Sequence, residues 1–214
     1  MIPNLAVATY TRHDLCDRML RSVDVEVGHL LVVDNGGGFV VPDGPWGRVS
    51  VLPMPTNFGV GPSWNLAFKC LYEHDVVFVV SDDVVLRPGN LSRLAEVASA
   101  ETLTLSGTWP HWCLFAAGQR FLERVGLFDE RIWPAYHEDK ELEWRAAQLG
   151  GRIVMSDVEV GHDNSSTMLT PGRDFGRRKA ASEIANKSLF DQKIADGDVS
   201  TGWSAYRWRE QRWS

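Results

Sequence analysis

EHDVVFVVSDDVVLRPGN, residues 73–90, contains an apolar run followed at once by two adjacent carboxylates, Asp82 and Asp83. The run is rich in β-branched residues and is bounded by polar ones, which predicts a buried strand. A hard dication such as Mg²⁺ or Mn²⁺ prefers oxygen ligands, and a bound diphosphate supplies some of them, so two carboxylates suffice for a metal site. Surface acids that merely follow a strand are the alternative that these residues alone leave open.

Strand-like and helix-like segments alternate on both sides of this stretch. Before it, strands are predicted at 4–10, 29–35 and 48–54, and helices at 15–23, where Thr11 and Asp14 resemble a capping box, and at 61–74. After it, a helix is predicted around 91–98, strands around 103–107 and 113–118, and helices at 137–149 and 177–194. The alternation predicts an α/β fold, with a mostly parallel central sheet flanked by helices.

Length and composition favour a soluble protein with one compact core. The 214 residues are 44% hydrophobic, enough for a single domain. No apolar run reaches the roughly 18 residues that span a bilayer, and the N-terminus lacks the features of a signal peptide, so a cytoplasmic protein without a transmembrane segment is expected. The three cysteines are widely separated, which indicates neither a disulfide framework nor a zinc site.

The charge is distributed unevenly along the chain. Residues 171–214 hold nine Lys and Arg against six Asp and Glu, whereas residues 1–170 hold thirteen against twenty-two. An acidic body argues against general nucleic-acid affinity, which needs dense positive charge. The basic and aromatic end YRWREQRWS, residues 206–214, is either a local contact or an ordinary solvated terminus.

Polar side chains follow three of the predicted strands, at Thr9, Asp34 and Asp82. In open α/β sheets ligands bind beyond the carboxyl ends of the strands, so these ends are expected to converge on one crevice. Asp34 could accept hydrogen bonds there from a base or ribose, or it could form a turn. NFGVGPSWN, residues 57–65, is a glycine-bearing turn that opens a helix, where backbone N–H groups can approach a phosphate; a plain bend is the alternative.

RIWPAYHEDKELEWR, residues 131–145, is the densest group of functional side chains. Asp139 and Glu143 lie one helical turn apart as like charges, which is unfavourable unless something compensates. Early acids also suit a helix dipole, so a charged N-terminus is the structural alternative. His137 and Glu141 have the spacing of a metal pair, but no HExxH motif is present.

Taken in order, seven stretches resemble the successive signatures of family 2 glycosyltransferases with the GT-A fold: VATYTR, VVDNGG, NFGVGPSWN, VVSDDVVL, FAAGQRFLERVGLFDERIW, YHEDKELEWRAAQLG and VGHDNSST. The resemblance covers roughly residues 4–170. It implies a GT-A domain over 1–170, with a nucleotide-sugar half at 1–90 and an acceptor and catalytic half at 91–170. A C-terminal helix and basic aromatic tail would occupy 171–214.

The resemblance also implies roles for individual residues. Asp83 occupies the DXD-type position that holds Mn²⁺ or Mg²⁺, and His162 is expected to join the metal or phosphate shell. Asp139 takes the position of the catalytic base, with Glu138 beside it contacting acceptor or donor sugar, while Glu141 stands where the family often has Asp. The nucleotide-sugar site is expected to contain Thr9, Arg12, Asp34, Asn57, Gly59, Asn65 and Asp82.

Three tryptophans surround the expected acceptor side: Trp109, Trp112 and Trp133. Flat rings pack against the apolar faces of sugars, so acceptor binding is predicted, with core packing as the alternative.

The expected function is a metal-dependent inverting glycosyltransferase, a hexosyl or related sugar transferase. The resemblance implies a UDP-sugar as donor, and a hydroxyl acceptor on a protein, a glycan or a modified nucleic-acid base. A sugar nucleotidyltransferase is an alternative, although its glycine-rich, lysine-bearing N-terminal loop is missing. A degenerate nucleotide- or carbohydrate-binding protein is another, against which the intact Asp82, Asp83, Glu138 and Asp139 argue.

Overall fold

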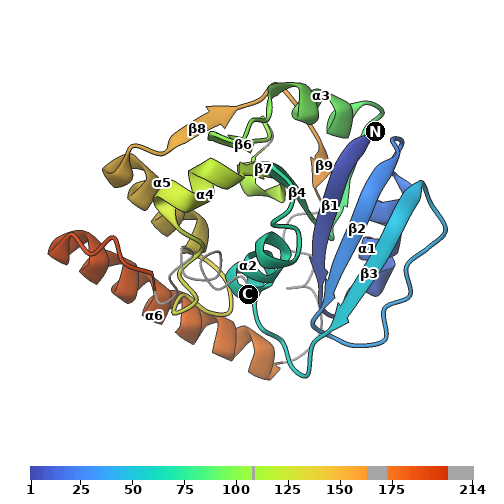
Figure 1. Cartoon of the computed structure of the whole chain (residues 1–214). Coiled ribbons are helices and arrows are strands. Elements are labelled where there is room, and N and C mark those ends of the chain that lie inside the picture. The colour runs from blue at the N-terminus through green and yellow to red at the C-terminus, as the bar shows by residue number, and fades with distance from the viewer. Residues whose placement is uncertain (108, 163–172, 202–214) are drawn as a thin grey trace, which may run out of the picture.

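The computed structural model describes residues 1–107, 109–162 and 173–201 (Figure 1). The first half of the chain contains β1 (Ile2–Thr9), α1 (His13–Arg21), β2 (Val27–Asp34), β3 (Trp46–Pro53), α2 (Val60–Cys70), β4 (Val76–Ser81) and β5 (Val84–Val85). The second half contains α3 (Asn90–Val97), β6 (Thr102–Leu105), the short 3₁₀ helix η1 (His111–Cys113), β7 (Leu114–Gly118), α4 (Gln119–Val125), α5 (Glu138–Leu149), β8 (Arg152–Met155), β9 (Gly161–His162) and α6 (Arg173–Asp196).

Seven strands form the central sheet, in the order β3-β2-β1-β4-β7-β6-β8. All neighbouring pairs are parallel except the two that involve β7, which runs against both β4 and β6. The strands β5 and β9 make a separate antiparallel pair directly after the end of β4. The mostly parallel sheet predicted from the sequence is confirmed.

Helices cover both faces of the sheet and enclose two apolar clusters. The first cluster joins one face of β1, β2 and β4 to α1 and α3, through residues such as Met19 and Leu94. The second joins the other face to α2, α4 and α5, through residues such as Phe68, Phe121 and Leu142. Figure 1 shows α2 in front of the strands and α1 behind them. The alternation of sides follows from right-handed crossovers between parallel strands.

The predicted segments agree with most of the longer elements, but their ends differ. Four helices, α1, α2, α3 and α5, overlap the predicted stretches with ends shifted by up to four residues, and α6 contains the predicted segment 177–194. The helix α4 and the strand β8 were not predicted. The capping box at the start of α1 was a wrong prediction, because the N-cap is Arg12 and it carries no side-chain cap. Asp14 instead accepts two hydrogen bonds from the Arg12 guanidinium.

Across the described parts of the chain, every helix is too short or too polar to cross a membrane.

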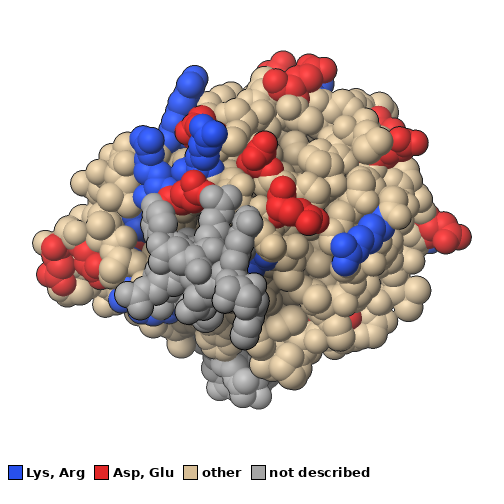
Figure 2. Space-filling model, viewed as in Figure 1, with Lys and Arg blue, Asp and Glu red and all other residues tan. Residues whose placement is uncertain are grey.

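Figure 2 shows how charged side chains are distributed on one face of the molecule. Several basic side chains gather at the upper left with acidic side chains beside them, and other acidic side chains lie separately toward the top and the right.

Candidate active site

Three strand ends meet at the carboxyl edge of the sheet, as predicted. Thr9 pairs with Asp34, and Ala8 pairs with Ser81, so Thr9, Asp34 and the residue after Ser81 lie side by side. That residue is Asp82, which is half-buried, and its neighbour Asp83 is only 7% exposed. Burial and the adjacent charge of Asp83 raise the pKa of Asp82 to about 7. The edge therefore concentrates negative charge.

The β5–β9 pair brings a distant segment to this edge. Val84, the residue after Asp83, lies opposite His162 in the antiparallel register. The backbone of His162 is thus next to the acidic pair, although 79 positions separate it from Asp83 in the sequence. Its side chain lies outside the described part of the structure.

Asp34 is committed to its own loop. Its side chain is 1% exposed and accepts hydrogen bonds from the backbone N–H groups of Gly36, Gly37 and Phe39. His13 approaches the same carboxylate at 3.5 Å. The turn-forming alternative therefore describes the observed contacts, and base binding by Asp34 stays a prediction.

The turn before α2 is built around Gly59. Its φ of 85° lies in the left-handed region, and its N–H donates to Asn57 Oδ1 at 2.9 Å. A Cβ at this position would clash with Pro134 O and lie 2.9 Å from Trp133 Cδ1. Glycine is thus required both by the turn and by the close approach of the segment that leads to α5.

Asn65 and Asn35 hold this turn in place. The buried Asn65 amide donates to Phe128 O and Glu130 Oε1 and accepts from Phe128 N. Asn35 donates to Ser63 Oγ and accepts from the N–H of Phe58. In the observed contacts Asn65, predicted to bind nucleotide sugar, fastens α2 to the loop after α4.

Glu138 and Asp139 begin α5 and have different surroundings. Glu138 is buried, its Oε2 has no hydrogen-bond partner among the described residues, and burial with the Asp139 charge raises its pKa to about 8. Asp139 is half-buried and accepts from the N–H of Lys140. A Cβ added at Gly61 would lie 3.7 Å from Glu138 Cβ. The two carboxyl residues therefore lie beside the first turn of α2.

The backbone before Glu138 is strained. Tyr136 and His137 have φ values of 72° and 74°, in the left-handed region that non-glycine residues rarely adopt. Asn186 of α6 donates to the carbonyls of Ala135 and Tyr136 and accepts from Trp133 N–H. Strain of this kind persists where surrounding contacts hold it, and α6 supplies those contacts here.

A buried ionic network joins α6 to α5. Lys193 is 2% exposed and donates to Asp129 Oδ2 at 2.6 Å and Glu141 Oε1 at 2.7 Å. Arg145 makes two hydrogen bonds to Glu141 and also donates to the carbonyls of Val125 and Leu127. Burial opposes ionisation of Asp129, but hydrogen bonds from Arg131 and Lys193 outweigh it and hold the pKa of Asp129 well below its usual range. Glu141, whose role was uncertain, thus belongs to this network.

The remaining predicted residues lie at the rim or in the core. The Arg12 guanidinium is partly exposed beside Asp14. Trp109 and Trp133 are 75% and 51% exposed. Trp112, by contrast, lies in the core, stacked on Trp64, and donates to Glu143. Core packing therefore describes Trp112, and acceptor binding stays a prediction for the two exposed rings.

The sequence-based reasoning overlooked four residues that support the site: Asn35, Asp129, Asn186 and Lys193. Their partners lie up to 64 positions away, so no local pattern marks them.

Comparison with known proteins identifies solved structures with a similar fold. No family model matches the chain, and no curated protein matches it. Among solved structures, it is similar to TarS of S. aureus, with 18% identity, a TM-score of 0.55, and coverage of 75% of this chain and 36% of TarS. The chain thus spans about a third of that neighbour. The catalytic domain of Drosophila β1,4-galactosyltransferase 7 in complex with xylobiose has 12% identity and a TM-score of 0.57, with 79% and 74% of the two chains covered.

A third neighbour was crystallised with ligands. Glucosyl-3-phosphoglycerate synthase from Mycobacterium tuberculosis, in complex with Mn²⁺ and UDP-glucose, has 15% identity and a TM-score of 0.52, with 86% and 78% of the two chains covered. The chain has the GT-A fold of nucleotide-sugar transferases, as expected from the sequence.

Proposed function

We propose that the protein is a family 2 inverting glycosyltransferase that is metal-dependent and transfers a sugar from a UDP-sugar to a hydroxyl acceptor. The observation that carries the proposal is the meeting of Thr9, Asp34 and the Asp82–Asp83 pair at the carboxyl edge of a GT-A sheet. The neighbours support it, because their structures include β1,4-galactosyltransferase 7 with manganese and UDP-Gal, and the synthase with Mn²⁺ and UDP-glucose.

The acidic pair fits a hard dication. Burial and repulsion from the charge of Asp83 raise the pKa of Asp82 to about 7. The direction of this change indicates that nearby groups do not neutralise the negative charge of the pair. Asp83 would hold Mn²⁺ or Mg²⁺, with Asp82 beside it and His162 from β9. When bound, the ion would neutralise charge on the departing nucleoside diphosphate.

The two carboxyl groups at the start of α5, Glu138 and Asp139, have different proposed roles in proton transfer. With a pKa of about 8, Glu138 keeps its proton at neutral pH and can donate a hydrogen bond to a sugar hydroxyl. Asp139 is then the base that removes the acceptor proton as the acceptor oxygen attacks the anomeric carbon. Attack opposite the leaving diphosphate inverts the configuration at that carbon.

We assign the nucleotide and acceptor ends of the proposed site to further residues. Thr9, Arg12 and the Asn57–Gly59 turn would surround the nucleotide diphosphate, and the exposed rings of Trp109 and Trp133 would pack on the acceptor. A protein side chain, a glycan and a modified nucleic-acid base all offer a suitable hydroxyl. Transfer assays with each of these three classes would identify the acceptor.

An Asp139→Asn variant tests the catalytic assignment. UDP-sugar hydrolysis should fall by roughly 10²–10⁴-fold, because general base catalysis contributes about that much. UDP binding, measured by thermal stabilisation, should persist. Asp75→Asn is the matched control, since Asp75 is exposed at the amino end of β4, at the opposite edge of the sheet. Equal hydrolysis in both variants would remove Asp139 from the mechanism, and absence of hydrolysis in the wild type together with UDP binding would favour a binding protein.

A further inference from the structure

A second group of potential metal ligands lies far from the candidate active site. His29, Glu73 and His74 each offer one ligand atom, and the three atoms lie within 4.8 Å of one another. His29 is near the amino end of β2, and Glu73 and His74 immediately precede β4. Because β2 and β4 are both parallel to β1, these residues share the amino edge of the sheet. His29 precedes Asp34 by five positions along β2, a distance of about 16 Å.

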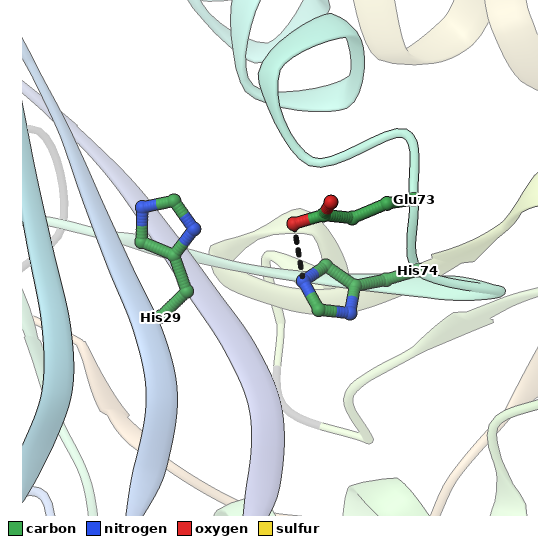
Figure 3. Close-up of side chains that lie close together, drawn as sticks. All are labelled: His29, Glu73 and His74. Carbon is green, nitrogen blue, oxygen red and sulfur yellow. Dashed lines mark ion pairs between the residues drawn. The ribbon is translucent and has the colours of Figure 1, made fainter.

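The side chains converge. Figure 3 shows the His29 ring turned toward Glu73 and His74, which come from the connection between α2 and β4. Glu73 Oε1 lies 3.8 Å from His74 Nε2, too far for a hydrogen bond. His74 Nε2 is buried and has no hydrogen-bond partner among the described residues. A buried ring nitrogen without a partner is costly, unless something binds it.

His29 is prepared to act as a ligand. Its Nε2 lies 2.9 Å from Ser50 Oγ of β3, which leaves the other ring nitrogen for the cluster. Metal-bound histidines usually have their second nitrogen held in this way, which fixes the ring orientation.

We propose that His29, Glu73 and His74 form a binding site for a divalent transition metal of the Zn²⁺ type. Two imidazoles and one carboxylate suit Zn²⁺ and leave a fourth position for water. With bonds of about 2.0–2.1 Å, tetrahedral ligand atoms lie roughly 3.3 Å apart. Rotation of Glu73, whose side chain is 63% exposed, supplies movement toward that spacing. A bound ion would fasten the connection before β4 to the second strand, away from the nucleotide edge.

The test is Zn²⁺ binding by the untagged, metal-free full chain, in competition with a chromogenic chelator at neutral pH. One strong site should be present in the wild type, and its affinity should fall by roughly tenfold or more in His74→Ala and in Glu73→Gln. Glu73→Gln is the safer variant, because the side chain is exposed. His111→Ala and Glu96→Gln are the matched controls, since both residues lie outside the cluster.

An Asp83→Asn variant separates this site from the proposed active site. Zinc affinity should be unchanged in that variant, and Zn²⁺ should raise its unfolding temperature as it does for the wild type. The proposal is overturned if the wild type binds no zinc, or if His74→Ala and Glu73→Gln bind it as tightly as the wild type. Loss of the site in Asp83→Asn alone would assign the zinc to the carboxyl edge of the sheet instead.

Discussion

At the scale of single residues, Glu138 carries the most unusual chemistry. Its carboxyl is buried beside Asp139, and its Oε2 lacks a hydrogen-bond partner in the described structure. The sequence places the two carboxylates side by side, but it could not show which of them points inward. That choice depends on Gly61 and on the strained turn at Tyr136 and His137, which tertiary contacts impose.

The raised pKa of Glu138 makes stability depend on pH. In the unfolded chain the carboxyl ionises near its ordinary value of 4.5, whereas in the folded protein it keeps its proton up to about 8. The folded state therefore binds the extra proton between these values, and the free energy of unfolding should fall as pH rises through that window. Urea titrations across the window should show a weaker fall for Glu138→Gln than for the wild type. An unaltered pH profile in Glu138→Gln, matching that of Glu96→Gln, would contradict this assignment.

Gly59 tests the packing of the turn before α2. Gly59→Ala places an alanine at φ 85° and ψ 179°, a backbone region essentially restricted to glycine, at a cost of about 1–3 kcal/mol, and also creates a clash with Pro134 O. Gly89→Ala is the control for a positive φ without a clash, because Gly89 has φ 82° and ψ −2° with open space around its Cβ position. Urea denaturation should show the larger loss of stability for Gly59→Ala. Equal losses would mean that the approach of Pro134 is not restrictive.

At the scale of elements, α6 is the support of the candidate catalytic loop. Asn186 holds the carbonyls of Ala135 and Tyr136, and Lys193 reaches Asp129 and Glu141. Both contacts come from one helix and flank the segment that positions Glu138. Figure 1 shows α6 beside this part of the molecule. The helix therefore stabilises the body of the fold, although the sequence placed it beyond the region of resemblance.

Two lysines on α6 allow a matched comparison. Lys193→Met should destabilise the protein by about 1–3 kcal/mol, because buried Asp129 and Glu141 each lose a charged hydrogen-bond donor and keep only their arginine partners. Lys187→Met removes only an exposed pair with Asp191, worth a few tenths of a kcal/mol. Chemical denaturation measures both. Similar small losses would show that Lys193 does not fasten α6.

The sequence predicts elements better than it predicts their contacts. Long strands and helices were predictable because each carries its own apolar period. The two-residue strands β5 and β9 were not, since pairing across 77 residues creates them. Lys193 resembles any solvated lysine of a charged helix, and only the folded chain places it against Asp129. The cluster of His29, Glu73 and His74 was overlooked for the same reason.

At the scale of the whole molecule, the fold places two groups of functional side chains at opposite edges of the central sheet. The carboxyl edge holds Thr9, Asp34 and the acidic pair, and the amino edge holds His29 and His74. Strand direction alone produced the first grouping, so the sequence could predict it. Nucleotide binding should therefore depend on residues of the carboxyl edge, and zinc binding on residues of the amino edge. Neither ligand should need the other in order to bind.

Thermal unfolding with UDP and UDP-sugars, with and without Mn²⁺, tests the central claim most directly. A ligand that binds only the folded state raises its apparent stability, so UDP should raise the unfolding temperature in the presence of Mn²⁺. Asp83→Asn should abolish this metal-dependent rise while the variant remains folded. If no nucleoside diphosphate or nucleotide sugar stabilises the wild type, with or without Mn²⁺, the proposed glycosyltransferase function is contradicted.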